Sequence, residues 1–131
     1  MKKITVVLLM LLCFTSLAGC GNTSSKDVYY FPEPTKEIRV VKASEGIETE
    51  LVIGSENYDA EDLSVIPVME WFYGLELREC ERQESVEGSE CYTFTVDGQS
   101  AFIYENRGDK AHIIVDSKWY EVKNPSVPPI E

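Results

Sequence analysis

The sequence predicts an α+β fold: an N-terminal β-hairpin, one kinked helix, and then a four-stranded antiparallel meander that packs on the helix. Three observations support this class. Two β-rich runs near the start are separated by a short turn, apolar residues then recur at helical spacing, and β-rich runs joined by turn residues fill the second half.

The strands are predicted from β-rich runs that end at turn residues. The hairpin is expected at residues 37–42 and 47–53, where "EIRVVK" and "IETELVI" are separated by "ASEG" with Gly46 in the turn. Asp97 and Gly98 join two alternating runs, which is a strong signal for a two-residue hairpin turn. The expected meander strands are "CYTFTV", "QSAFIYE", "KAHIIV" and "KWYEV" (residues 91–96, 99–105, 110–115 and 118–122).

The helix is expected between the hairpin and the meander. Asp59 suits the N-cap and Gly74 the C-cap, and apolar residues lie between them at helical spacing. Those residues are Leu63, Ile66, Met69, Phe72 and Tyr73. Pro67 falls inside this span and removes a hydrogen bond there, so a kink or two short helices is expected. Residues 75–80 alternate in polarity and are expected to be extended.

The first residues have the pattern of an export signal. Lys2 and Lys3 precede an apolar run of 15 residues, Ile4–Ala18, which small residues follow. A helix that crosses the hydrocarbon core needs roughly 20 apolar residues, so this run is short for a permanent span. A short transmembrane anchor that is never cut is the alternative.

The residues at the end of this run narrow the interpretation. "LAGC", residues 17–20, resembles the lipobox of bacterial lipoproteins, in which two small residues precede a cysteine. The resemblance implies that the signal peptide, residues 1–19, is removed and that the Cys20 sulfur carries the lipid, a diacylglycerol. Two acyl chains suffice for stable membrane anchoring. The implied location is the cell membrane, with the protein on its extracytoplasmic face.

The mature chain is expected to hold one domain. Residues 20–36 are assigned to the lipidated cysteine and a tether, although Val28–Phe31 is expected to pack on the domain edge. Residues 37–131 form the domain, whose tail "NPSVPPIE" is rich in proline and should be extended. The early β-rich stretch, helix and closing aromatic pair resemble small uncharacterised domains of Gram-positive lipoproteins, a likeness of pattern that implies no chemistry.

Charge and composition exclude several classes of function. The signal holds two of the 12 Lys and Arg residues and no acid, so ten basic residues face 23 acidic ones in the mature chain, a formal charge of −13. Nucleic-acid binding requires clustered Lys and Arg, which this sequence lacks. One histidine and two cysteines do not give a usual zinc spacing, and no cofactor is expected.

Two cysteines remain in the mature domain apart from the lipid site. Cys80 and Cys91 form an even pair in an exported domain, which favours one disulfide, with a pair of free buried thiols as the alternative. The bridge requires the two Cα atoms to come within about 7 Å.

No catalytic constellation is recognised. His112 has no serine or cysteine nucleophile at a recognisable spacing, and strand alternation places it on one face with Ile114. "RGD" at residues 107–109 is interpreted as a turn. A solvated loop is expected for the acids Glu79, Glu81, Glu84, Glu87 and Glu90. Core packing is favoured for the aromatic residues near the helix and the last strand, with one member of each pair facing outward. The alternative is an interaction surface, for which the candidates are Trp71, Tyr73 and Trp119.

These observations favour a non-enzymatic lipoprotein that presents a binding domain, with an unidentified protein partner. An inhibitor or immunity-like protein that blocks a secreted enzyme with its acidic loop is the alternative. A hydrolase would require carboxylates that converge around His112.

Cys20→Ser should leave an unprocessed precursor, because the lipid acceptor thiol is removed and cleavage follows lipid attachment in the lipoproteins that the motif resembles. Metabolic labelling with a radioactive or alkyne fatty acid, followed by electrophoresis, measures both effects. Continued labelling of the variant would contradict the assignment. Cys13→Ser, inside the signal, is the matched control and should still be labelled and cut.

Overall fold

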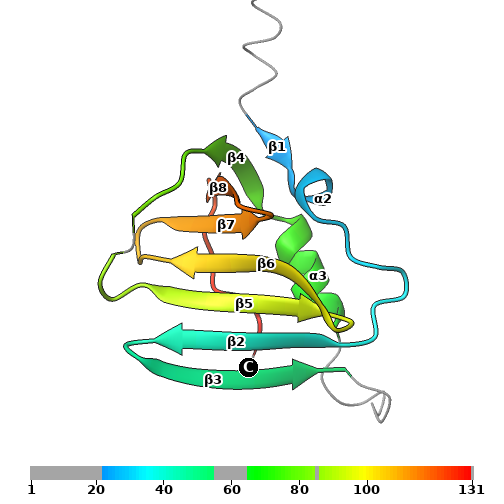
Figure 1. Ribbon diagram of the computed structural model, residues 1–131. Coiled ribbons are helices and arrows are strands. Elements are labelled where there is room, and N and C mark those ends of the chain that lie inside the picture. Colours follow the sequence, from blue (N-terminus) through cyan, green and yellow to red (C-terminus); the bar gives the residue numbers. More distant parts are fainter. Residues whose placement is uncertain (1–21, 55–64, 85, 131) are drawn as a thin grey trace, which may run out of the picture.

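The structure is a computed structural model that describes residues 22–54, 65–84 and 86–130. Its strands form a single eight-stranded antiparallel sheet in the order β1-β4-β8-β7-β6-β5-β2-β3 (Figure 1). The strands are β1 (Thr23–Ser24), β2 (Ile38–Ser44), β3 (Ile47–Ile53), β4 (Glu76–Cys80), β5 (Glu90–Val96), β6 (Gln99–Asn106), β7 (Ala111–Val115) and β8 (Lys118–Val122). The helices are α2 (Ser25–Val28) and α3 (Ile66–Tyr73).

The predicted α+β class is wrong. The described helices have only four and eight residues, and the expected four-stranded meander is part of a larger sheet. The hairpin β2–β3 does not stand apart, because β2 pairs with β5 from Ile38 opposite Val96 to Ser44 opposite Glu90. On the other side of the meander, β4 pairs with β8 and β1 with β4. The protein is therefore mostly β, and these distant pairings are what unite its strands.

The tight turns form where turn residues tolerate positive φ. Glu45 and Gly46 have φ values of 52° and 81°, and Asp97 and Gly98 have 49° and 81°, the type I′ pattern that matches the strand twist. Asp97 also holds the segment just before β2, since its Oδ1 accepts hydrogen bonds from the backbone N–H groups of Lys36 and Glu37. The β5–β6 turn therefore also fixes the start of β2.

Helix α3 begins later than the sequence suggested. Val65 is its N-cap, so Pro67 lies in the first turn, where a backbone N–H has no partner inside the helix in any case. The predicted kink at Pro67 is wrong for this reason, and the alternative of a separate short helix before it falls on residues outside the described ranges. Gly74 is the C-cap, as predicted, and its N–H donates to the Glu70 carbonyl at 3.0 Å. Asp59 and Leu63 lie outside the described residues.

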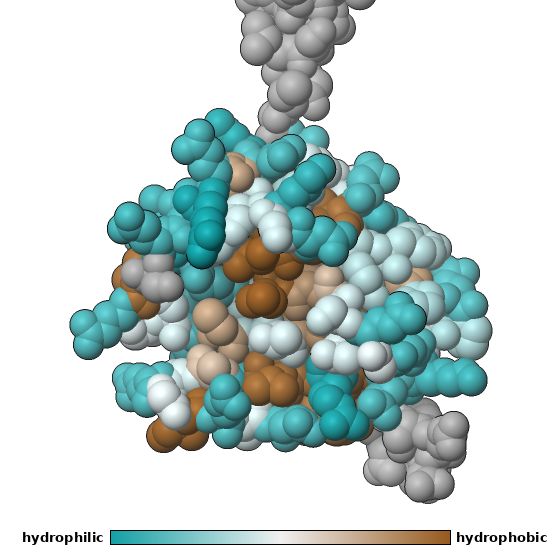
Figure 2. Space-filling model, viewed as in Figure 1, coloured by the Kyte–Doolittle hydropathy of each residue, from teal (hydrophilic) through white to brown (hydrophobic). Residues whose placement is uncertain are grey.

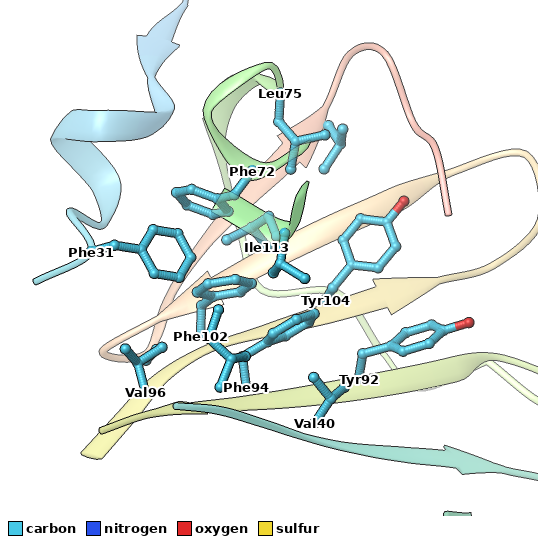
Figure 3. Close-up of a cluster of buried hydrophobic side chains, with 14 of the residues drawn as sticks. Phe31, Val40, Phe72, Leu75, Tyr92, Phe94, Val96, Phe102, Tyr104 and Ile113 are labelled. Carbon is cyan, nitrogen blue, oxygen red and sulfur yellow. The ribbon is translucent and has the colours of Figure 1, made fainter. Parts of the chain in front are cut away.

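One aromatic cluster forms the core between α3 and the sheet (Figure 3). The ring of Phe72 stacks on that of Phe102 with centres 4.5 Å apart, and Phe102 stacks on Phe94 at the same distance. Trp71 lies against Phe94 and Tyr104, with ring centres 5.9 and 5.1 Å apart. All of these sheet residues point to the same side, so α3 covers one face of the sheet.

The segment assigned to a tether is largely part of the folded domain. β1 pairs with β4, and the Ser25 hydroxyl donates to the Tyr73 carbonyl. Phe31 is fully buried against Phe72 and Phe102, which confirms that this part of the segment packs on the domain. The folded domain thus begins near Thr23 rather than at residue 37. Cys20 lies outside the described residues.

The C-terminal segment, Asn124–Ile130, is held on the same face of the sheet as α3. The indole N–H of Trp71 donates to the Ser126 hydroxyl at 3.0 Å, and the Tyr104 hydroxyl donates to the Ser126 carbonyl at 2.7 Å. Pro128 is buried. The proline-rich tail therefore forms no helix or strand but is part of the packed structure.

Val68→Ala should lower the free energy of unfolding by about 2 kcal/mol, because two buried methyl groups are lost and a cavity remains. Val68 is fully buried on α3, whereas Val86 is 48 % exposed. Val86→Ala, the same chemical change, should stay within about 0.5 kcal/mol of the unaltered chain. Urea unfolding followed by circular dichroism compares them, and equal effects would contradict the described core.

Candidate functional site

No helix of the described residues lies on the side of the sheet opposite α3, and we call this side the uncovered face. Directly paired residues share a face, so the register places Val41, Thr93, Ile103, Ile114 and Trp119 in one continuous row across five strands. All five side chains are partly exposed. Figure 2 shows this face, with an apolar patch near its centre and hydrophilic residues around it.

A second row runs beside the first and carries ionisable groups. It contains Cys91, Glu105, His112, Glu121 and Arg78, each opposite the next on the neighbouring strand. Glu105 and His112 are only 6 % and 4 % exposed. Glu105 and His112 thus lie buried on the central strands of the sheet, whereas Arg78 at the end of the row is exposed.

Arg107 neutralises the buried Glu105. Its Nε lies 2.6 Å from Glu105 Oε1, and both side chains are largely buried. The guanidinium also donates from Nη2 to the Glu84 carbonyl at 2.5 Å, which ties the loop after β4 to this face. Sequence reasoning missed this pair. The only local signal was an acid and a base two residues apart at the end of a strand.

His112 is neutral at this position. Its Nδ1 lies 3.5 Å from Glu105 Oε1 and makes no hydrogen bond. Burial lowers the pKa of His112 below its ordinary value of 6.5 and Arg107 lowers it further, whereas Glu105 and Glu121 act in the opposite direction. Burial has the larger effect because a charged imidazole loses its hydration on this strand. The expectation that His112 shares a face with Ile114 is confirmed.

The two thiols are free, and the predicted disulfide is not formed. Cys80 lies on β4 and Cys91 on β5, with β8, β7 and β6 between them. Four strand spacings of about 4.8 Å place them on the order of 19 Å apart, well beyond the reach of a bridge. Burial raises the pKa of both thiols, and Glu105 also raises that of Cys91. Both therefore stay protonated and weakly nucleophilic.

The three aromatic residues predicted as one interaction surface lie on two sides of the sheet. Trp71 packs in the core, and the Tyr73 hydroxyl accepts a hydrogen bond from the Phe31 N–H. Trp119 alone is on the uncovered face, where its ring meets that of His112 with centres 5.7 Å apart. The structure therefore does not bring the three residues together.

The remaining sequence motifs have ordinary structural roles. The "RGD" tripeptide is a turn, as predicted: Gly108 has a φ of 96° and its N–H donates to Asn106 Oδ1, while the Arg107 N–H donates to the Lys110 carbonyl. Within residues 22–54, 65–84 and 86–130, no group of three or more His, Cys, Asp or Glu is placed to hold a metal ion. In the same ranges, no helix has the length and apolarity needed to cross a membrane.

No family model, curated protein or solved structure matches the chain. The interpretation of the uncovered face therefore depends on its own geometry.

His112→Gln should make stability less sensitive to acid. Because the pKa of His112 is lowered in the folded chain, the unfolded chain takes up a proton at a higher pH, so the free energy of unfolding falls as the pH drops below about 6.5. The unaltered chain should thus lose more stability between about pH 7 and pH 5 than the variant. Urea unfolding at each pH measures this, and equal losses would show that His112 does not titrate as described.

Proposed function

We propose that this chain is a lipoprotein held at the extracytoplasmic face of the cell membrane through Cys20, and that its folded domain is a non-enzymatic binding domain. The partner is another protein, which docks on the uncovered face. The observation that carries the proposal is the row of partly exposed side chains across five strands, on which no helix or strand of the described residues packs.

The composition of this face fits a protein interface. Such interfaces combine a central apolar patch with a polar rim, and tryptophan is prominent among the residues that supply binding energy. Ile103, Ile114 and Trp119 provide the centre, while Arg39 and Arg78 lie exposed at two sides of the same face. The patch is rigid because every residue in it is fixed by strand pairing, so little ordering is needed on binding.

The chemistry of the ionisable row supports binding rather than catalysis. Glu105 is already paired with Arg107, burial lowers the pKa of His112, and the pKa of the Cys91 thiol is raised. A catalytic base requires a positioned partner and a nucleophile within reach. The row of ionisable groups therefore acts as a structural element beside the apolar patch.

The anchor would bring the domain close to the membrane. Cys20 is separated from β1 by two residues, a reach of about 10 Å for extended chain including the step to Thr23. A lipid on Cys20 would thus hold the β1–β4 edge next to the bilayer. The uncovered face extends away from that edge, where a partner outside the membrane can reach it.

A photo-crosslinking experiment on intact cells tests this proposal. p-Benzoylphenylalanine at Thr93, which lies in the partly exposed row beside Ile103, should yield a discrete adduct with another protein. The same group at Tyr30, which is 55 % exposed on the α3 side next to Tyr73, is the matched control and should yield none. Adducts from both positions, or from neither, would contradict a partner on the uncovered face.

The inhibitor alternative makes a different prediction for the same experiment. Glu84 is tied to Arg107 at the border of the uncovered face, so an acidic-loop contact would lie beside the Thr93 adduct. Replacing Glu81, Glu84 and Glu87 together with Gln should abolish that adduct if the loop carries the binding, because its attraction is electrostatic. Under the proposal favoured here, the triple variant keeps the adduct.

A further inference from the structure

Among residues 22–54, 65–84 and 86–130, strand β3 is a long free edge of the sheet. It is the last strand in the order and pairs only with β2, over all of its seven residues and without a bulge (Figure 1). The opposite edge, β1, has only two residues. Natural proteins protect an edge by shortness, proline, a bulge or charged side chains, and of these β3 has only the charges of Glu48 and Glu50.

The turn geometry shows which backbone groups of β3 are unpaired. Ser44 and Ile47 flank the two-residue turn Glu45–Gly46, and the residues that flank such a turn form a hydrogen-bonded pair. Along an antiparallel ladder, hydrogen-bonded pairs then alternate with pairs that make no backbone hydrogen bond to each other. The alternation directs the N–H and C=O groups of Glu48, Glu50 and Val52 away from β2. An extended chain beside the seven-residue strand β3 would therefore meet three backbone N–H donors and three C=O acceptors, one of each from these three residues.

A cavity lies beside this edge on the α3 side of the sheet. It has a volume of about 550 Å³, and Thr49 and Leu51 of β3 belong to its wall. Val40 and Tyr92 extend the wall along the sheet, and the proline-rich segment Val127–Ile130 closes the opposite side. A strand added next to β3 would turn every second side chain toward this side, where an apolar residue can enter the cavity.

The charges along β3 select the kind of strand that can be added. Glu48 and Glu50 project on the uncovered-face side, and Glu45 precedes them in the turn. The cation on that side is Arg39, whose Nη1 lies 3.1 Å from Glu50 Oε1. On the other side Lys42 lines the cavity, where its Nζ lies 3.7 Å from Glu90 Oε2. A second copy of this chain would bring its own Glu48 and Glu50 to the same edge, and like charges across a strand pair are destabilising. A basic strand would be favoured at the same positions.

We propose that β3 is a docking edge for an extended segment of another protein in which basic residues alternate with apolar ones. The segment adds a ninth strand to the eight-stranded sheet. Its basic residues lie opposite Glu48 and Glu50, and its apolar residues lie opposite Thr49 and Leu51 and fill the cavity. Main-chain hydrogen bonds give this mode its affinity, and the cavity and the glutamates give it selectivity. The edge adjoins the row on the uncovered face, since Glu50 lies opposite Val41, but the docking uses the backbone of β3 and the cavity rather than that row.

The test uses the full chain in nonionic detergent and two capped, fluorescent peptides, Lys-Val-Lys-Val-Lys-Val-Lys and Glu-Val-Glu-Val-Glu-Val-Glu. Fluorescence anisotropy should show binding of the first peptide only, and the binding should weaken as salt is added. Amide NMR shifts should centre on Glu48, Glu50 and Val52, whose N–H groups gain acceptors. Shifts confined to the uncovered face, or equal binding of both peptides, would overturn the proposal.

Two variants separate the backbone contribution from the charges. Val52→Pro removes one outward N–H while leaving the ladder to β2, and it should weaken binding about tenfold, whereas Val52→Thr keeps the N–H and should bind like the unaltered chain. The double variant Glu48→Gln with Glu50→Gln keeps the edge but should lose the preference for lysine over glutamate. The proposal is overturned if neither Val52→Pro nor the double glutamate variant changes the binding. A β3-mediated dimer of the unaltered chain at the concentrations used would also overturn it.

Discussion

The packing of Phe72 on Phe102 is the contact on which the rest of the structure depends. It holds α3 against the centre of the sheet, and Trp71 extends the same contact to Tyr104 and the C-terminal segment. Within the described ranges, α3 is the only helix longer than four residues. One helix can cover only one face of the sheet, so the strands carry aromatic and aliphatic residues on that face and a mixed set on the other.

The other face accommodates charge at its centre through a single close pair. Glu105 would be costly to bury alone, but Arg107 lies 2.6 Å away and also ties down the loop after β4. His112 remains neutral beside them. The result is a firm, mixed surface that leaves Ile103, Ile114 and Trp119 in reach of a partner. The two edges of the sheet differ in length, since β1 has two residues and β3 has seven, so only β3 is long enough to accept another strand.

Features encoded locally could be predicted from the sequence. The turns at Gly46 and Gly98 and the strands around them lie within a residue or two of their expected positions, because turn residues and alternation act over a few residues. Pro67 was assigned to a helix interior because nothing local indicated that α3 begins one residue before it. The fold class was missed because the pairing of β2 with β5 and that of β4 with β8 join segments far apart in the chain. The expected site failed for the same reason: Trp71 and Trp119 cannot be assigned to a face before the pairing is known.

By itself, the sequence determined the alternation of each strand, the positions of the tight turns, the strong negative charge and, as a prediction, a lipid on Cys20. Only the tertiary structure decided that the hairpin and the meander form one sheet, that Cys80 and Cys91 lie apart, and that Glu105, Arg107 and His112 meet. The physical reason is that turn and strand preferences act between neighbours, whereas the choice of strand partners depends on which distant side chains bury one another beneath α3.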